Sequence, residues 1–201
     1  MSTSKDEPRY HHGDLRRALV AGGLVLLEEK GASALGLREI ARLVGVSAAA
    51  PYRHFADRKA LLEAVAAEGF RGFAAAMAKA AEGLPEAEQL AAMAFAYVRF
   101  ALDEPALFRL MFSSDLHPYR DGELREHADA AYATIAVAAA REDKSAPGEM
   151  AVTCWSFVHG LAMLVLEEQI LGVTAGNADA LVRVLTERFV RDIRAGRRET
   201  A

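Results

Sequence analysis

The residues whose types could do chemistry gather between Gly45 and Phe55, in the sequence GVSAAAPYRHF. Tyr52, Arg53 and His54 stand in a row, and all three side chains carry hydrogen-bond donors that suit phosphate oxygens. The three alanines before them present only methyl groups, which can contact thymine methyls and let the backbone come close to the bases. This pattern favours contact with a nucleic acid.

The preceding residues predict the helices that would position this cluster. In residues 37–44, LREIARLV, apolar residues recur at the spacing of one buried helical stripe. Gly45 can adopt the left-handed conformation that ends such a helix, and Ser47 can cap the next one, which we expect from Ala48 to about Phe55. Two short helices joined by a tight turn form a helix-turn-helix, whose second helix enters the major groove of DNA.

Two residues set the limits of the neighbouring helices. Pro51 has no N–H, so the second helix should start a residue late or open with a tight turn. Asp57 suits the N-cap of a further helix, which we expect to run to about Lys79. Lys59 lies in its first turn, where the ammonium group and the positive helix end could together receive a phosphate. A plain solvated lysine is the alternative.

The charge of the chain is divided in a way that favours a local DNA contact. Residues 1–60 carry ten Lys and Arg against seven Asp and Glu, whereas the rest of the chain carries fourteen against twenty-one. The net charge of −4 excludes a general polyanion binder. The basic residues near the cluster are Arg38, Arg42, Arg53, Arg58 and Lys59. We therefore expect a basic face on an acidic body.

The sequence lacks the motifs that are typical of several other classes of protein. There is no glycine-rich phosphate loop, no G-x-S-x-G elbow and no carboxylate pair near a histidine. We therefore predict that the protein is not an enzyme. Cys154 is the only cysteine, which excludes an intramolecular disulfide and a cysteine-pair zinc site. His11 and His12 are adjacent and do not share a helix face, so no metal or cofactor is expected. The first residues hold no apolar run typical of a secretory signal, and we expect a cytoplasmic protein.

Helical periodicity runs through nearly the whole chain, without an alternating run typical of a strand, and predicts an all-α fold. The first helix is expected from Asp14 to Lys30. Gly22 and Gly23 within it indicate either a closely packed neighbouring helix or glycines that are simply tolerated. Residues 150–166 are uncharged and as long as the shortest membrane spans. Their internal polar residues and the lack of a basic flank oppose a membrane span, and predict a helix buried on all sides, in a core or between subunits.

Together these residues resemble the TetR (tetracycline repressor) family of bacterial transcriptional regulators. The resemblance rests on residues 37–65, LREIARLVGVSAAAPYRHFADRKALLEAV, and on YHHGDLRRAL at 10–19. Further on, YVRFALDEPALFRLMF at 97–112 and WSFVHG at 155–160 resemble the subgroup whose C-terminal domain is named for a Trp-His-Gly signature. The resemblance implies an N-terminal three-helix helix-turn-helix domain and a C-terminal helical bundle for ligand binding and dimerisation.

The resemblance also implies where the domains lie. A flexible N-terminal arm would occupy residues 1–12 and the helix-turn-helix DNA-binding domain residues 13–60. A connecting helix would occupy residues 61–79, and the ligand-binding and dimerisation domain residues 80–201.

Specific DNA contacts follow from the same resemblance. Arg38 falls on a base-contacting position, whereas Tyr52, His54 and Lys59 fall on phosphate contacts. Because the alanines at the base-reading positions are non-polar, Arg38, Arg53 and DNA shape are expected to carry more of the specificity. The predicted DNA-binding residues are Arg38, Ser47, Ala48, Ala49, Ala50, Tyr52, Arg53, His54 and Lys59.

The C-terminal part holds more aromatic and thioether side chains than a compact bundle needs, which favours an apolar pocket for an unidentified small-molecule effector. Taken singly, each of these residues could instead be ordinary core. The predicted ligand-binding residues are Phe95, Tyr97, Phe100, Phe108, Met111, Phe112, Tyr132, Trp155, His159 and Met163.

Family members bind DNA as homodimers, in which the last two long helices pair with those of the partner subunit. The resemblance places these helices at Met150 to Gly172 and Ala178 to about Arg194. The predicted dimer-interface residues are Leu164, Leu171, Leu181, Leu185 and Phe189. The operator would then be a near-palindrome of double-stranded DNA, with recognition helices about 34 Å apart. The predicted function is a repressor released by an apolar or amphipathic effector. The alternative is a helical ligand-binding protein of the same fold with weak or effector-dependent DNA binding.

Overall fold

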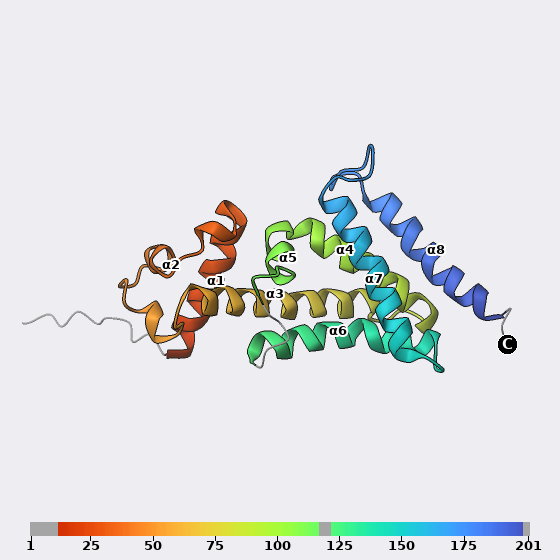
Figure 1. Cartoon of the computed structure of the whole chain (residues 1–201), viewed down its shortest axis with the longest axis horizontal. Coiled ribbons are helices and arrows are strands. Elements are labelled where there is room, and N and C mark those ends of the chain that lie inside the picture. The colour runs from red at the N-terminus through yellow and green to blue at the C-terminus, as the bar shows by residue number, and fades with distance from the viewer. Residues whose placement is uncertain (1–11, 117–121, 199–201) are drawn as a thin grey trace, which may run out of the picture. The chain divides into compact units, whose positions relative to one another are not determined.

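The computed structural model describes residues 12–116 and 122–198, and within them all regular structure is helical (Figure 1). The all-α prediction is confirmed. The chain divides into two compact units, residues 1–65 and 66–201. The expected N-terminal arm lies outside the described residues except for its last residue, His12, which begins the first helix.

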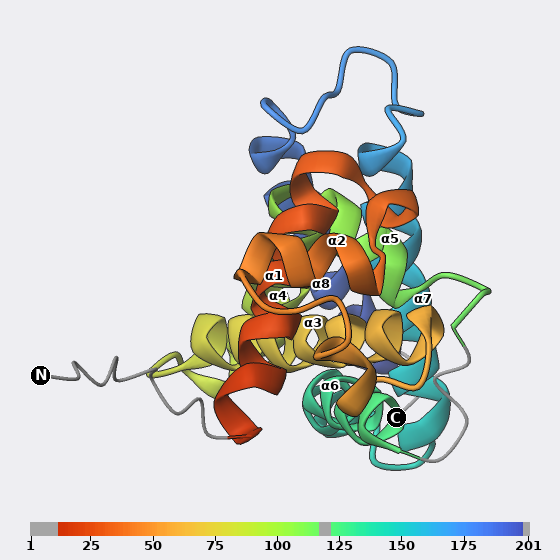
Figure 2. The ribbon, with the colours of Figure 1, turned by 90° about the vertical axis from the view of Figure 1, so that its left-hand side faces the viewer.

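The first unit is built from short helices around one core. Its elements are α1 (His12–Lys30), the 3₁₀ helix η1 (Ala32–Ala34), α2 (Leu37–Val44), the 3₁₀ helix η2 (Pro51–Arg53) and the first residues of α3 (Arg58–Ala81). α2 packs against α1 and η2, as the crossing of α1 and α2 in Figure 2 shows. The core side chains that hold them together include Leu19, Leu35, Ile40, Phe55 and Leu61.

Two adjacent glycines let the helices of this unit approach closely. A Cβ atom added to Gly22 would lie 3.0 Å from Cγ2 of Val44, and one added to Gly23 would lie 2.7 Å from Cγ2 of Val65. Carbon atoms do not pack at the shorter of these distances, so the backbone of α1 occupies space that a side chain would need. Of the two interpretations of this glycine pair, the closely packed neighbour is confirmed.

The second unit is a bundle of the remaining helices. After α3 come α4 (Glu86–Asp103), α5 (Pro105–Met111), α6 (Glu123–Glu142), α7 (Pro147–Leu166) and α8 (Asp179–Arg198). α4 packs against both α7 and α8, and α7 packs against α6 as well (Figure 1).

The predicted span of the penultimate helix, residues 150–172, was wrong at both ends. The helix begins three residues earlier, at Pro147, whose missing N–H is harmless at a helix start. It ends at Leu166 because Glu168 turns the chain with a positive φ of 51°, and Gln169 donates its N–H to the carbonyl of Leu164 at 2.8 Å. Residues 167–172, expected to be helical, therefore belong to the loop before α8.

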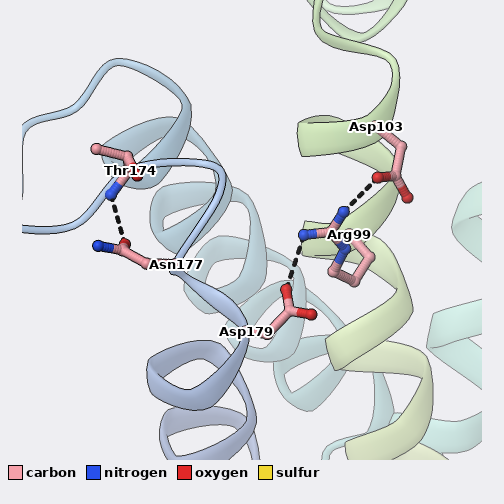
Figure 3. A network of polar contacts seen from close by, with 5 residues as sticks. All are labelled: Arg99, Asp103, Thr174, Asn177 and Asp179. Carbon is pink, nitrogen blue, oxygen red and sulfur yellow. Dashed lines mark hydrogen bonds and ion pairs between the residues drawn. The ribbon is translucent and has the colours of Figure 1, made fainter.

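Polar contacts fix this loop and both ends of α8. Asn177 accepts a hydrogen bond from the N–H of Thr174 at 2.8 Å (Figure 3). It also donates one to the carbonyl of Gly172 at 3.0 Å. Beside it, Arg99 of α4 bridges Asp103 of its own helix and Asp179 at the start of α8, at 2.7 Å from the latter. These contacts tie the start of α8 to α4.

The C-terminal half of α8 is held by one arginine. Arg194 donates through Nε to Glu142 at the end of α6, at 2.8 Å, and through Nη1 to the carbonyl of Ala87 in α4, at 2.8 Å. α8 is therefore fixed near both ends by guanidinium groups, which hold several acceptors in one plane.

Within this chain α7 is not buried as a core helix, so burial between subunits stays a prediction. It is the one helix in the described part of the chain that is long and apolar enough to cross a membrane by length and composition, and 33% of that stretch is buried inside the second unit. Cys154, Val158 and Val165 lie on its buried face, whereas Val152 and Leu164 on the other side are 52% and 48% exposed. The helix is therefore not buried on all sides within one chain.

A glycine contact in the second unit yields a stability prediction. A Cβ atom on Gly69 of α3 would lie 2.8 Å from Sδ of Met111 and 2.9 Å from Cδ1 of Leu107. Gly69→Ala should lower the free energy of unfolding by about 1–3 kcal/mol because these α5 side chains must move. Chemical denaturation followed by circular dichroism measures the change.

Gly72→Ala is the matched control one turn further along α3. Its added Cβ meets only Cε2 of Phe100, at 3.9 Å, so this change should be neutral or should stabilise by up to about 1 kcal/mol. Equal destabilisation by the two substitutions would contradict the close packing at Gly69.

Candidate nucleic-acid interface and ligand cavity

The turn of the predicted helix-turn-helix has the expected geometry. Gly36 is the N-cap of α2, and Gly45 ends the helix in the left-handed region with φ 77° and ψ 31°. The N–H of Val46 then returns to the carbonyl of Ala41 at 2.9 Å, which satisfies one of the last carbonyls of the helix.

The second helix of the motif is shorter than predicted. Instead of an α-helix over residues 48–55, a turn leads into η2, which runs only from Pro51 to Arg53. The N–H of Ala50 bonds to the carbonyl of Ser47 at 3.0 Å, but Pro51 has no N–H with which to continue the ladder. The tight opening turn expected from the proline is therefore present, and the α-helix that should follow is replaced by 3₁₀ geometry.

The residues predicted to contact DNA form a largely exposed surface on this unit. Six are exposed, namely Arg38, Ser47, Ala48, Ala49, Tyr52 and Arg53, and three are half-buried, namely Ala50, His54 and Lys59. Tyr52 is 52% exposed although it is a large aromatic residue. Pro51 and Phe55 are buried beneath the surface and anchor the segment, with Arg16 of α1 lying over the Phe55 ring at 5.6 Å.

The start of α3 supplies a further cationic position. Asp57 caps the helix by accepting the N–H of Ala60 at 2.8 Å, as predicted. Lys59 lies in the first turn, and its Nζ is 3.9 Å from Glu63 with both side chains partly exposed. An ion pair of that length in contact with solvent is weak. Lys59 can therefore exchange this partner for a phosphate.

Arg58 has a different role from the one its charge suggested. Its Nε donates to the carbonyl of Leu35 at 2.7 Å, and its Nη2 donates to the carbonyl of Ala32 at 2.5 Å. It thereby holds the segment between α1 and α2, although the residue itself remains exposed. No sequence signal separates it from Arg42, which is exposed and pairs with Glu39 at 3.0 Å.

The second unit contains a cavity of about 650 Å³, within the range of sites for small organic ligands. Its lining comes mainly from α6 and from residues 112–116 after α5, with further residues from α3, α4, α5 and α7, and it is predominantly aromatic and aliphatic. The lining residues are Phe70, Phe73, Tyr97, Met111, Phe112, Ser113, Ser114, Leu116, Arg125, Ala128, Asp129, Ala131, Tyr132, Ile135 and Trp155.

Half of the predicted ligand-binding residues line this cavity: Tyr97, Met111, Phe112, Tyr132 and Trp155. The others lie outside the lining, namely Phe95, Phe100, Phe108, His159 and Met163. Phe108 and Phe100 instead pack against Phe73 in the aromatic core, at centroid distances of 6.2 and 5.0 Å. Phe95 lies in a second hollow between α4 and α8, beneath the guanidinium of Arg183 at 4.3 Å.

Sequence reasoning missed the contribution of α3. Phe70 and Phe73 are three residues apart, so they share one face of that helix, and both line the cavity. This spacing is a usable signal, although the sequence analysis predicts only a connecting role for the segment.

A hydrogen-bonded chain joins α4 to α7 at this cavity. Nε1 of Trp155 donates to the hydroxyl of Tyr97 at 3.1 Å, and that hydroxyl lies 2.9 Å from Nδ1 of His159. Burial raises the pKa of Tyr97 and lowers that of His159, so both groups are held in their neutral forms near pH 7. The ring of His159 also packs on Phe112, at a centroid distance of 4.7 Å.

The charged residues of the lining neutralise each other. Arg125 and Asp129 lie one turn apart on α6, and Nε of the arginine is 2.7 Å from the carboxylate. Their side chains are 41% and 60% exposed, which places them in contact with solvent. Ser113 and Ser114 add hydroxyl groups that are half-buried and exposed respectively.

Cys154 does not contribute a reactive thiol. It is buried on the inner face of α7, and this burial, with a smaller effect from Glu142, raises the pKa of the thiol to about 11. Among the residues that the structure describes, no cluster of three or more potential metal ligands occurs.

The predicted dimer-interface residues are all exposed or half-buried in this chain. Leu171 is fully exposed and Leu164 is 48% exposed, whereas the three residues on α8, Leu181, Leu185 and Phe189, are half-buried. The inner row of α8 is instead Val182, Thr186 and Val190, each displaced by one residue from that stripe.

The unexpected role of Arg58 leads to a prediction. Arg58→Ala should lower the free energy of unfolding of the first unit by about 1–3 kcal/mol, because the carbonyls of Leu35 and Ala32 lose a charged donor. Thermal and chemical denaturation measure the effect. Arg42→Ala is the control, since its surface ion pair should contribute no more than about 1 kcal/mol. A loss no larger for Arg58 than for Arg42 would show that the two carbonyls are satisfied without it.

The two units match two parts of one known family. Residues 19–65 match the family described as bacterial regulatory proteins, tetR family. Residues 90–189 match the description tetracyclin repressor-like, C-terminal domain. No curated protein is similar enough to count as a match.

Solved structures share the fold. A protein of unknown function from Rhodococcus sp. RHA1 is 33% identical, with a TM-score of 0.77, and the alignment covers 92% of this chain and 98% of that one. The TetR family transcriptional regulator PfmR from Thermus thermophilus shares the fold at 20% identity and a TM-score of 0.58, over 86% and 97% of the two chains.

A transcriptional regulator of the TetR/AcrR family from Thermobifida fusca also shares the fold, at 20% identity and a TM-score of 0.64, over 87% and 97% of the chains. The helix-turn-helix geometry, the helical second unit and both family matches lead to one conclusion. The chain belongs to the TetR family of bacterial DNA-binding transcriptional regulators.

Proposed function

We propose that this regulator is a homodimeric repressor that leaves a near-palindromic operator when a small apolar or amphipathic molecule enters the cavity of the second unit. The observation that carries the proposal is the exposed surface of Arg38, Tyr52 and Arg53 with the alanine methyls, on a chain that also contains an apolar cavity of about 650 Å³. Under this proposal the protein is cytoplasmic, acts on DNA and is not an enzyme.

The proposed DNA contacts divide by chemistry. Tyr52, His54 and Lys59 would contact phosphates and fix the position of the protein on the duplex, without reading sequence. Arg38 and Arg53 can reach base edges, where a bidentate contact to guanine discriminates by about 1–3 kcal/mol. The methyl groups of residues 48–50 would contact thymine.

The shortness of η2 and these non-polar positions also favour the second candidate function. In that case the protein is a ligand-binding member of the family whose DNA binding is weak or requires the effector. Shape-dependent readout would then matter more than hydrogen bonds to bases.

The proposed domains follow the family pattern, with a DNA-binding domain at 13–60, a connecting helix at 61–79 and a ligand-binding and dimerisation domain at 80–201. We also assign the last of these to the Trp-His-Gly subgroup. Supporting this assignment, Trp155 and His159 of the signature are joined through the hydroxyl of Tyr97 at the cavity.

Effector action would operate through α3. Met111 lines the cavity and packs within 3 Å of the Cβ position of Gly69 on α3. A ligand that displaces Met111 in one arrangement of the bundle and not in another would therefore shift the equilibrium between the two arrangements. Allosteric coupling of this kind typically amounts to about 1–3 kcal/mol.

DNA contact by Lys59 predicts a change in salt dependence. Lys59→Ala should weaken binding to a duplex of random sequence and reduce the slope of log K against log salt by about one, since one fewer phosphate is neutralised. Fluorescence anisotropy at several salt concentrations measures the slope. Lys79→Ala removes the same charge from an exposed position in the last turn of α3 and should leave the slope unchanged. Identical slopes for all three proteins would remove Lys59 from the interface.

The proposed dimer seam predicts dissociation by an added charge. Leu185→Glu should yield monomers in sedimentation velocity, because a two-fold interface brings two copies of the carboxylate into the apolar seam. Val137→Glu, at a 58% exposed position of α6 outside the proposed seam, is the control and should remain dimeric. A stable dimer of a folded Leu185→Glu variant would place the interface on another face.

A further inference from the structure

Among the residues that line the cavity and carry a hydroxyl or charged group, one is fully buried. The Tyr97 side chain is 1% exposed and lines the cavity. The other lining residues that end in charged or hydroxyl groups are half-buried or exposed, namely Ser113, Ser114, Arg125, Asp129 and Tyr132. A hydrogen bond shielded from water discriminates between ligands more strongly than one that competes with solvent. Tyr97 is therefore the residue most able to select a ligand by hydrogen bonding.

The hydrogen-bond partners of the Tyr97 hydroxyl determine whether it can act as a donor or as an acceptor toward a ligand. The indole N–H of Trp155 is a donor only, so the Tyr97 oxygen accepts it at 3.1 Å. If Nδ1 of His159 also donated, the Tyr97 O–H would be a buried donor facing apolar side chains, at a considerable cost in free energy. The favourable arrangement has Tyr97 donating its proton to Nδ1 of His159 over 2.9 Å.

This arrangement leaves Tyr97 without a proton for a ligand. Because the N–H of Trp155 occupies one lone pair of the Tyr97 oxygen, only the other lone pair can accept a hydrogen bond from a ligand. A carbonyl or ether oxygen placed against it would be repelled, whereas a hydroxyl or N–H group would be bound. The rest of the cavity favours a ligand without charge, because Arg125 and Asp129 pair with each other and the remaining walls are mostly aromatic or aliphatic.

We propose that Tyr97 selects the ligand of this cavity, and that the ligand class is an uncharged, mainly aromatic molecule with a hydrogen-bond donor at its buried end. His159 and Trp155 act as positioning residues that fix the polarity of the Tyr97 hydroxyl. The inference rests on the proposed function only for the role of the ligand as an effector.

The test compares two probes that differ in one proton donor. Calorimetric titration of the full-length protein with 2-naphthol and with 2-methoxynaphthalene should show tighter binding of 2-naphthol by about tenfold, the factor expected for one net hydrogen bond in a buried site. Equal affinities, tighter binding of the ether, or no binding of either probe at millimolar concentration would overturn the proposal.

Three variants separate selection from structural effects. Tyr97→Phe should bring the affinity ratio of the two probes to about one. His159→Leu frees the Tyr97 proton, so 2-methoxynaphthalene should bind it more tightly than it binds the wild type, which a merely structural role would not produce. Thr153→Val removes a hydroxyl of α7 that bonds to the carbonyl of Glu149 and lies outside the cavity lining, and it should keep the wild-type ratio.

Persistence of the wild-type preference in folded Tyr97→Phe would refute the role of Tyr97. If that variant does not fold, His159→Leu decides, and an unchanged preference there would overturn the proposal. All titrations are made without DNA. Failure of the regulatory function would therefore appear as the absence of operator binding or release, independently of the probe affinities.

Discussion

Both units depend on close packing along α3, where a glycine leaves room for the side chain of a neighbouring helix. In the first unit Val65 occupies the space left by Gly23, and in the second unit Gly69 admits Met111 and Leu107. Because packed cores shift between discrete arrangements rather than deforming continuously, a displacement at Met111 acts directly on the backbone of α3. The same helix begins with the capped turn that presents the proposed phosphate contact.

α7 links the two proposed tasks of the second unit. Its inner side carries Trp155, which lines the cavity and bonds to Tyr97, and its outer side exposes Val152 and Leu164. An uncharged helix with a partly exposed apolar face is unfavourable in water unless another surface covers it. The proposed ligand binding and the proposed subunit contact would therefore involve the same helix, so a change in the geometry of one would act on the other.

The sequence predicted the ends of helices correctly where a single residue determines the local backbone conformation. Gly45 and Asp57 are the helix stop and cap that they were expected to be, since left-handed geometry and N-capping depend on the residue itself. Tertiary effects were not predictable in this way. Arg58 bonds to carbonyls more than twenty residues away, and the cavity is assembled from residues of several helices. The local turn at Glu168, which ends α7 early, has no glycine at that position to signal it.

Selection of bound duplexes from a random DNA pool by the purified protein, without added ligand, tests the central claim most directly. A dimeric repressor with two reading surfaces should enrich an inverted repeat whose half-sites lie about one helical turn, or a multiple of it, apart. Positions opposite residues 48–50 should favour thymine. Failure of a folded and dimeric protein to enrich any sequence would contradict the account and would favour a ligand-binding protein whose DNA binding is weak or needs its effector.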